Sequence, residues 1–101
     1  VAMESHLADP FSLQQLALIA GITPRHLNRL FINAVGQSVM QYYRQLRLTL
    51  AKRLIQNSSL DLASIAEATG YSNAGHFSNA YKSHFDVRPR AHRSMHFQST
   101  H

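Results

Sequence analysis

Apolar residues recur every three or four positions along most of the chain, the spacing that places them on one face of an α-helix. The strict alternation of a half-buried strand does not occur. Five glycine and proline residues divide the chain into short periodic stretches: Pro10, Gly21, Gly36, Gly70 and Pro89. The pattern predicts an all-α fold of about seven helices, counting a short one before Pro10.

Cap signals mark the first two of these helices. Ser12-x-x-Gln15 fits a capping box, and Gly21 can adopt the left-handed conformation that ends a helix. Thr23 favours the start of a second helix, which we expect to end at Gly36. The residues expected to be buried in this second helix are Leu27, Leu30, Phe31 and Ala34.

The longest predicted helix follows Ser38 and covers about residues 39–56, a length of about 27 Å. Its apolar positions form an arc of nearly half the circumference, wider than one buried face needs. Such a helix can serve two small cores. We therefore expect it to connect two subdomains, residues 1–57, which include it, and residues 58–97, followed by a polar tail at 98–101.

The second half of the chain repeats the signals of the first. Asp61 caps a short helix that ends at Gly70, and Ser72 or Asn73 caps another that runs to about Phe85. At an offset of 49 residues, Ser12, Leu13, Leu16, Ala17, Gly21 and Thr23 fall on Asp61, Leu62, Ile65, Ala66, Gly70 and Ser72. At an offset of 50, Leu27, Leu30 and Phe31 fall on Phe77, Ala80 and Tyr81. Each copy reads as cap, short helix, glycine turn, cap and second helix, which is the helix-turn-helix pattern.

The charge balance favours an anionic partner. The chain has 10 Lys and Arg against 5 Asp and Glu, a formal net charge of +5. Residues 1–59 carry six basic and two acidic residues, whereas residues 60–101 carry four and three. Two helix-turn-helix copies on a basic chain predict that double-stranded DNA is the partner.

Several other classes of protein are disfavoured. The chain has no cysteine, and no apolar run approaches the length of a membrane span. His92-x-x-x-His96 has zinc-ligand spacing but no third ligand nearby, and the carboxylates are scattered singly. We therefore expect no metal, no cofactor, no catalytic residues and no membrane partner. The absence of a secretory signal and the initial Val1 predict a cytoplasmic domain cut from a longer protein.

The second unit carries the most specific motif of the chain. Its residues are Ile65-Ala66-x-x-x-Gly70-Tyr71-Ser72, then His76-Phe77-Ser78-x-Ala80-Tyr81-Lys82, Phe85, Pro89 and Arg93. Supporting residues are Leu27-x-Arg29-Leu30-Phe31, Gly36-x-Ser38, Tyr42, Arg47 and Ala51. Over about residues 5–93 the chain resembles the C-terminal DNA-binding domain of AraC/XylS-type bacterial transcription regulators. The resemblance implies two helix-turn-helix subdomains joined by a long linker helix, with the two recognition helices in successive major-groove segments.

Four residues depart from the pattern of that family. Asp86 stands where a glycine is usual, Arg88 where Ser or Thr is usual, and His92 where an aromatic residue is usual. Asn79 replaces the common Arg or Lys of the second recognition helix.

The resemblance, for the first unit, and the chemistry of the exposed polar side chains indicate which residues contact DNA. Arginine can bind guanine, and asparagine adenine, through paired hydrogen bonds. The expected base contacts are Arg25, Asn28 and Arg29 in the first unit and His76, Ser78 and Asn79 in the second. The expected phosphate contacts are Ser12, through the helix start that it caps, with Arg47, Arg53, Lys82 and Arg90.

Further partners follow from the resemblance alone. It implies an activator that contacts RNA polymerase and carries a sensor or dimerisation domain missing from this chain. The alternative is a helical protein-interaction or dimerisation module whose basic face is only solvated.

Overall fold

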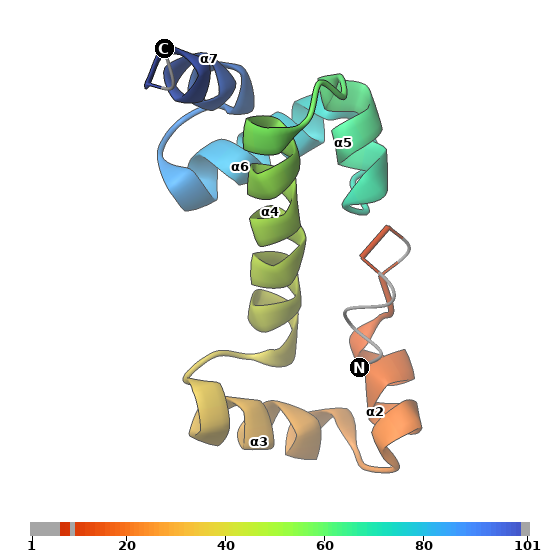
Figure 1. Cartoon of the computed structure of the whole chain (residues 1–101). Helices are drawn as coiled ribbons and strands as arrows, with labels where there is room; N and C mark the ends of the chain where they lie inside the picture. Colours follow the sequence, from red (N-terminus) through yellow and green to blue (C-terminus); the bar gives the residue numbers. More distant parts are fainter. Residues whose placement is uncertain (1–6, 9, 100–101) are drawn as a thin grey trace. The chain divides into compact units, whose positions relative to one another are not determined.

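The computed structural model describes residues 7, 8 and 10–99, and their side chains as far as residue 95 (Figure 1). Within this part the chain forms six helices and no strand, so the predicted all-α class is confirmed. The helices are α2 (Leu13–Ala20), α3 (Pro24–Val35), α4 (Val39–Asn57), α5 (Leu62–Ala68), α6 (Ala74–Phe85) and α7 (Pro89–Ser99). The short helix expected before Pro10 falls on residues of which only 7 and 8 are described.

The cap signals determine where the helices begin. Ser12 Oγ accepts from the Gln15 amide at 3.2 Å, and Gln15 Oε1 accepts from the Ser12 amide at 2.7 Å, which completes the predicted capping box. Thr23 caps α3 as expected. Of the two candidates for the cap of α6, the structure selects Asn73, whose Oδ1 accepts from the His76 amide at 2.7 Å.

Left-handed residues end the same helices. Gly21 and Gly36 follow α2 and α3 with φ of 73° and 74°. Asp86 follows α6 with φ of 61°, so it adopts a conformation that usually favours glycine. Asp86 replaces the glycine that is usual in the family, and the left-handed turn is kept.

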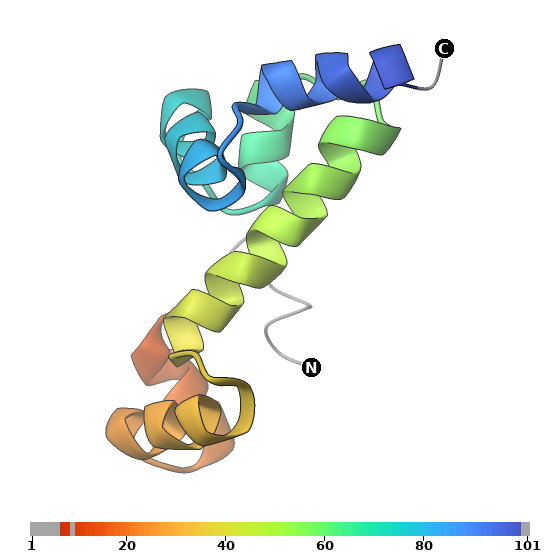
Figure 2. The same cartoon turned by 90° about the vertical axis from the view of Figure 1, so that its left-hand side faces the viewer.

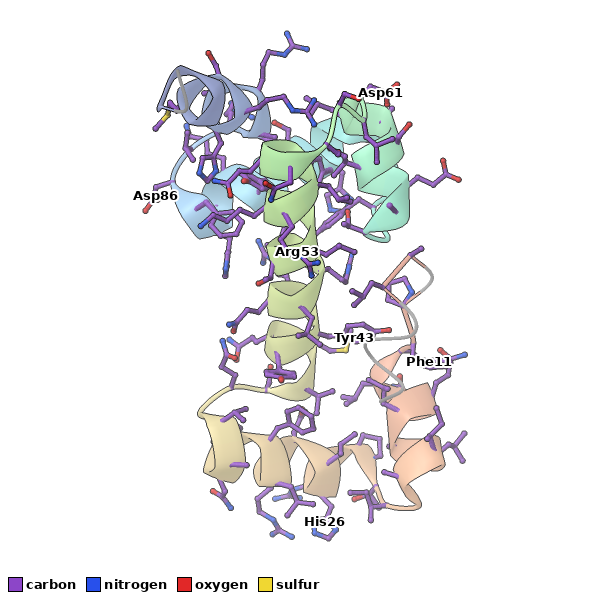
Figure 3. The ribbon with its side chains drawn as sticks, in the orientation of Figure 1. Phe11, His26, Tyr43, Arg53, Asp61 and Asp86 are labelled. Atoms are coloured by element: carbon purple, nitrogen blue, oxygen red, sulfur yellow. The ribbon has the colours of Figure 1, made fainter. Side chains whose placement is uncertain are left out.

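The chain divides into two compact units, Val1–Leu46 and Arg47–His101, and α4 passes from one to the other. In the first unit Val39 and Tyr43 of α4 are buried with side chains of α2 and α3. The Tyr43 hydroxyl accepts from the Phe11 amide at 3.0 Å, and Figure 3 shows these two residues facing each other.

The second unit has the larger core. Leu48, Ala51 and Ile55 of α4 are fully buried against the next helices. Figure 2 shows α5, α6 and α7 gathered around the C-terminal part of α4. The remaining members of this core are Ile65, Ala66, Tyr71, Phe77 and Tyr81. The two cores therefore use successive lengths of one helix, as its wide apolar arc suggested, and the boundary between the units falls within α4 rather than at its end.

The expected buried face of α3 is only partly correct. Leu27 is buried and Phe31 is half-buried, but Leu30 is 46% exposed and Ala34 is exposed as well. The first core is small, so it covers a narrower part of α3 than the apolar spacing suggests.

Candidate nucleic-acid interface

The outer face of α3 carries two arginines. Arg25 and Arg29 are both exposed, and their spacing of four residues places them on one face of the helix. That face lies opposite the buried Leu27. Their guanidinium groups are thus available for hydrogen bonds outside the protein.

Two other polar residues of α3, Asn28 and His26, are less accessible than these arginines. Asn28 is half-buried, and its Oδ1 accepts from the Val39 amide at 3.0 Å. It therefore satisfies an amide at the start of α4 that no helical carbonyl can reach. His26 is half-buried and lies on the outer side of α3 in Figure 3.

The second recognition helix, α6, presents different chemistry. His76 is exposed, and its ring packs nearly perpendicular to the Tyr71 ring at a centroid distance of 5.4 Å. Ser78 and Asn79 both accept hydrogen bonds from Arg88 Nη1, at 3.1 Å and 3.3 Å. Sequence reasoning did not include Arg88 among the candidate residues.

Arg47 lies inside the second unit. Its Nε donates to the Thr69 carbonyl at 2.8 Å and its Nη2 to the Gly70 carbonyl at 3.0 Å. The guanidinium carbon is 4.3 Å from the centroid of the Tyr71 ring. These contacts satisfy carbonyls at the end of α5, so the side chain that was expected on a phosphate is engaged within the protein.

Arg93 has the same kind of role. Its Nε donates to the Ile55 carbonyl at 3.0 Å, near the end of α4. The long sequence separation of this pair explains why spacing along the chain could not reveal it.

The remaining phosphate candidates are at the surface. Arg53, Lys82 and Arg90 are exposed on α4, α6 and α7. Ser12 uses its hydroxyl and its own amide in the capping box, so a phosphate there would meet the next amides of α2.

Counting charges by the two units of the structure reverses the comparison of net charge that was made from the sequence. Seven basic and three acidic residues belong to Arg47–His101, and three basic and two acidic residues belong to Val1–Leu46. The net charges are therefore +4 for the second unit and +1 for the first. The opposite contrast in the sequence depended on counting the basic residues of the whole long helix with the first subdomain.

The pKa values of two titratable groups are shifted by their surroundings. The amide of Ser64 donates to Asp61 at the start of α5, and this bond lowers the pKa of the carboxyl below its ordinary value of 3.8. Burial raises the pKa of Tyr81 to about 12. The Tyr81 hydroxyl lies 2.7 Å from His92 Nδ1.

The described part of the chain contains no group of three side chains that could hold a metal ion. The side chain of His96 lies outside that part. Among the described helices, none combines the length and hydrophobicity that crossing a membrane requires.

Two consecutive helix-turn-helix units with exposed polar second helices define the class of this protein. A family model described as "Helix-turn-helix domain" matches residues 16–95. The chain is 44% identical over 87 residues to the HTH-type transcriptional regulator GlxA of Rhizobium meliloti. The aligned region covers 86% of this chain and 27% of GlxA. The chain belongs to the helix-turn-helix domain family, and it is of the AraC type.

Solved structures have the same fold. An AraC-type transcriptional regulator from Chromobacterium violaceum is 36% identical, with a TM-score of 0.88 over 96% of this chain and 87% of the other. The DNA-binding domain of AdpA, solved in complex with a target DNA, has a TM-score of 0.91 over 97% of this chain and 88% of the other. At 21% identity, AdpA supports the fold alone.

Proposed function

We propose that this chain is the sequence-specific DNA-binding domain of a transcription regulator, with α3 and α6 as its recognition helices. The observation that carries the proposal is the exposed pair Arg25 and Arg29 on α3, directly opposite the buried Leu27. An arginine pair on one helix face can bind guanine O6 and N7 in a major groove. The family to which the chain belongs supports the same conclusion.

The residues of the two units have different roles in this proposal. Arg25 and Arg29 contact bases, while Asn28 positions α4 through the Val39 amide. In the second unit His76 and Asn79 face the DNA with polar groups that form fewer bonds than arginine. Arg53, Lys82, Arg90 and the start of α2 contact phosphates. Arg47 supports the fold instead.

The wider partners belong to the same proposal. The relatives are named as transcriptional regulators, and the chain spans about a quarter of the length of GlxA. A sensor or dimerisation domain, contact with RNA polymerase, activation of transcription and a cytoplasmic location are expected of the whole protein. The domain contributes binding and has no catalytic step.

Salt dependence tests the proposal most simply. Neutralising six to ten phosphates releases counterions, so the logarithm of the binding constant should fall against that of salt concentration with a slope of about −5 to −9. The experiment is a mobility shift of a labelled duplex recovered by random selection. A slope shallower than about −2 would contradict DNA binding by this surface. A protein-interaction module would give no salt-dependent shift.

Two recognition helices in successive major-groove segments also predict the size of the footprint. We expect protection of close to two turns on one face of the duplex, about 20 base pairs. Protection of one short segment would mean that the second unit does not bind.

A further inference from the structure

Arg88 stands directly before α7, at the position that Ser38 occupies before α4 in the repeat. Ser38 caps its helix, since its Oγ accepts from the Gln41 amide at 3.3 Å. Arg88 cannot do so, because a guanidinium has five N–H donors and no acceptor. Its side chain returns to α6 and donates to Ser78 and Asn79.

The repeat explains what this contact replaces. Ser78 corresponds to Asn28, which accepts from the Val39 amide in the first unit. At the position of Val39 the second unit has Pro89, which has no N–H to donate. Nη1 of Arg88 supplies the missing donor.

The same contact leaves part of the guanidinium for another molecule. Both bonds, to Ser78 and to Asn79, are donated by Nη1. The neighbouring groups on Nε and Nη2 form a parallel pair, the arrangement that fits guanine O6 and N7. Arg88 is exposed, and its hydrogen bonds to the described residues come from Nη1 and not from this pair.

The anchor residues place the guanidinium beside the outer face of α6. Asn79 lies opposite the buried Phe77, at the repeat position of Arg29. The second recognition helix has no arginine of its own, and Arg88 brings one to it. We propose that Arg88, held on Ser78 and Asn79, is a specificity-determining residue that contacts a guanine in the second half-site, the base pairs under α6.

This inference rests on the proposed placement of α6 in a major groove. A base contact and a phosphate contact by Arg88 have different signatures. Loss of a guanine contact relaxes discrimination at one base pair, whereas loss of a phosphate contact weakens binding equally for all sequences.

The test compares Arg88→Ser with Arg90→Ser in a base-by-base scan of the selected duplex at fixed salt. Arg88→Ser introduces the residue found at the equivalent position of the first unit, where it can cap α7, so the variant should fold. Arg90→Ser is matched, because it removes the same exposed charge two residues away.

We expect Arg88→Ser to weaken binding about tenfold and to abolish discrimination at one guanine of the second half-site. Arg90→Ser should weaken binding of every sequence by the same factor. Equal weakening of all sequences by Arg88→Ser, or no weakening, would overturn the inference. If Arg88→Ser melts early, Arg88→Lys keeps the charge without the planar fork and should lose the same discrimination.

The scan also separates this inference from the proposed function. If the unaltered chain discriminates in the first half-site and not in the second, the role of Arg88 is wrong and the proposed function stands. If it discriminates in neither, the proposed function fails as well.

Discussion

The two units link the recognition helix to the following helix in different ways. In the first unit the donor of the linking bond is a backbone amide, that of Val39, and the Asn28 side chain accepts from it. Gly36 makes the left-handed turn between the two helices. In the second unit Asp86 makes the turn and the Arg88 side chain makes the link. A repeat detected in sequence therefore conserves the position of a contact while its chemistry changes.

The arginines of the two units also differ in where they lie. In the first unit Arg25 and Arg29 are exposed on the recognition helix. In the second unit Arg47 and Arg93 bind carbonyls at helix ends. The second unit has the higher net charge and yet fewer arginines on its recognition helix, so net charge does not locate base contacts.

Substitution of Arg47 should have the largest effect. Arg47→Ala removes two charge-assisted hydrogen bonds and a cation–π contact, and we expect the free energy of unfolding of the second unit to fall by about 3 kcal/mol. Thermal or urea unfolding measures it. Arg53→Ala is the control, because Arg53 is an exposed arginine of the same helix. If Arg47→Ala weakens DNA binding without lowering stability, Arg47 contacts phosphate as the sequence suggested.

The recognition helices should respond unequally to alanine. Arg25→Ala or Arg29→Ala should each reduce binding free energy by about 1–3 kcal/mol and relax specificity at one or two base pairs. His76→Ala should cost less, since a histidine forms one bond to a base where an arginine can form two. Asn79→Ala should also cost less, because Ser78 still accepts from Arg88 in that variant. Titration of each variant against the selected duplex gives the values. Larger losses in the second pair would reverse the comparison.

Two buried tyrosines of the second unit form a matched pair. The Tyr81 hydroxyl is bonded to His92, whereas the Tyr71 hydroxyl is buried with no hydrogen-bond partner among the described residues. Tyr81→Phe should lower the free energy of unfolding by about 1–2 kcal/mol, and Tyr71→Phe should leave it unchanged or raise it. Equal losses in both variants would show that the hydroxyl of Tyr71 has a partner.

The raised pKa of Tyr81 adds a pH dependence to that comparison. The folded state holds this proton up to a pKa of about 12, whereas the unfolded chain releases it near the ordinary value of 10.0. The stability that this group contributes is complete below pH 10 and is lost as the pH rises from 10 to 12. Unfolding at several alkaline pH values should therefore show a steeper decline for the unaltered chain than for Tyr81→Phe.

The left-handed turns should give the smallest effect. Asp86→Gly should raise the free energy of unfolding by about 0.5–1 kcal/mol, because glycine adopts this conformation without strain. Gly36→Asp should lower it by a similar amount in the first unit. A loss of stability in Asp86→Gly would mean that the aspartate side chain stabilises its own turn.

Local chemistry made much of the fold predictable from sequence. Ser12, Thr23 and Asp61 cap helices through bonds to residues three positions away, so their roles are visible in short stretches. The exposure of Leu30 was not predictable in this way, because it depends on how much of α3 the first core covers.

The candidate site was predictable only in part. Arg25 and Arg29 could be placed on an outer face by helical spacing alone. The bonds of Asn28 to Val39 and of Arg47 to Thr69 cross 11 and 22 residues and depend on tertiary packing. The repeat does contain one signal for the role of Arg88. Pro89 stands at the position of Val39 and has no amide N–H, so another group of the second unit must donate the equivalent hydrogen bond.

The central claim is that both units bind DNA and that the first contributes more of the sequence discrimination. The most direct measurement is a base-by-base scan of the selected duplex with the unaltered chain at fixed salt. The account predicts at least two strongly discriminated base pairs under α3, each worth about 1–3 kcal/mol, and fewer under α6. Stronger discrimination under α6 than under α3 would contradict it.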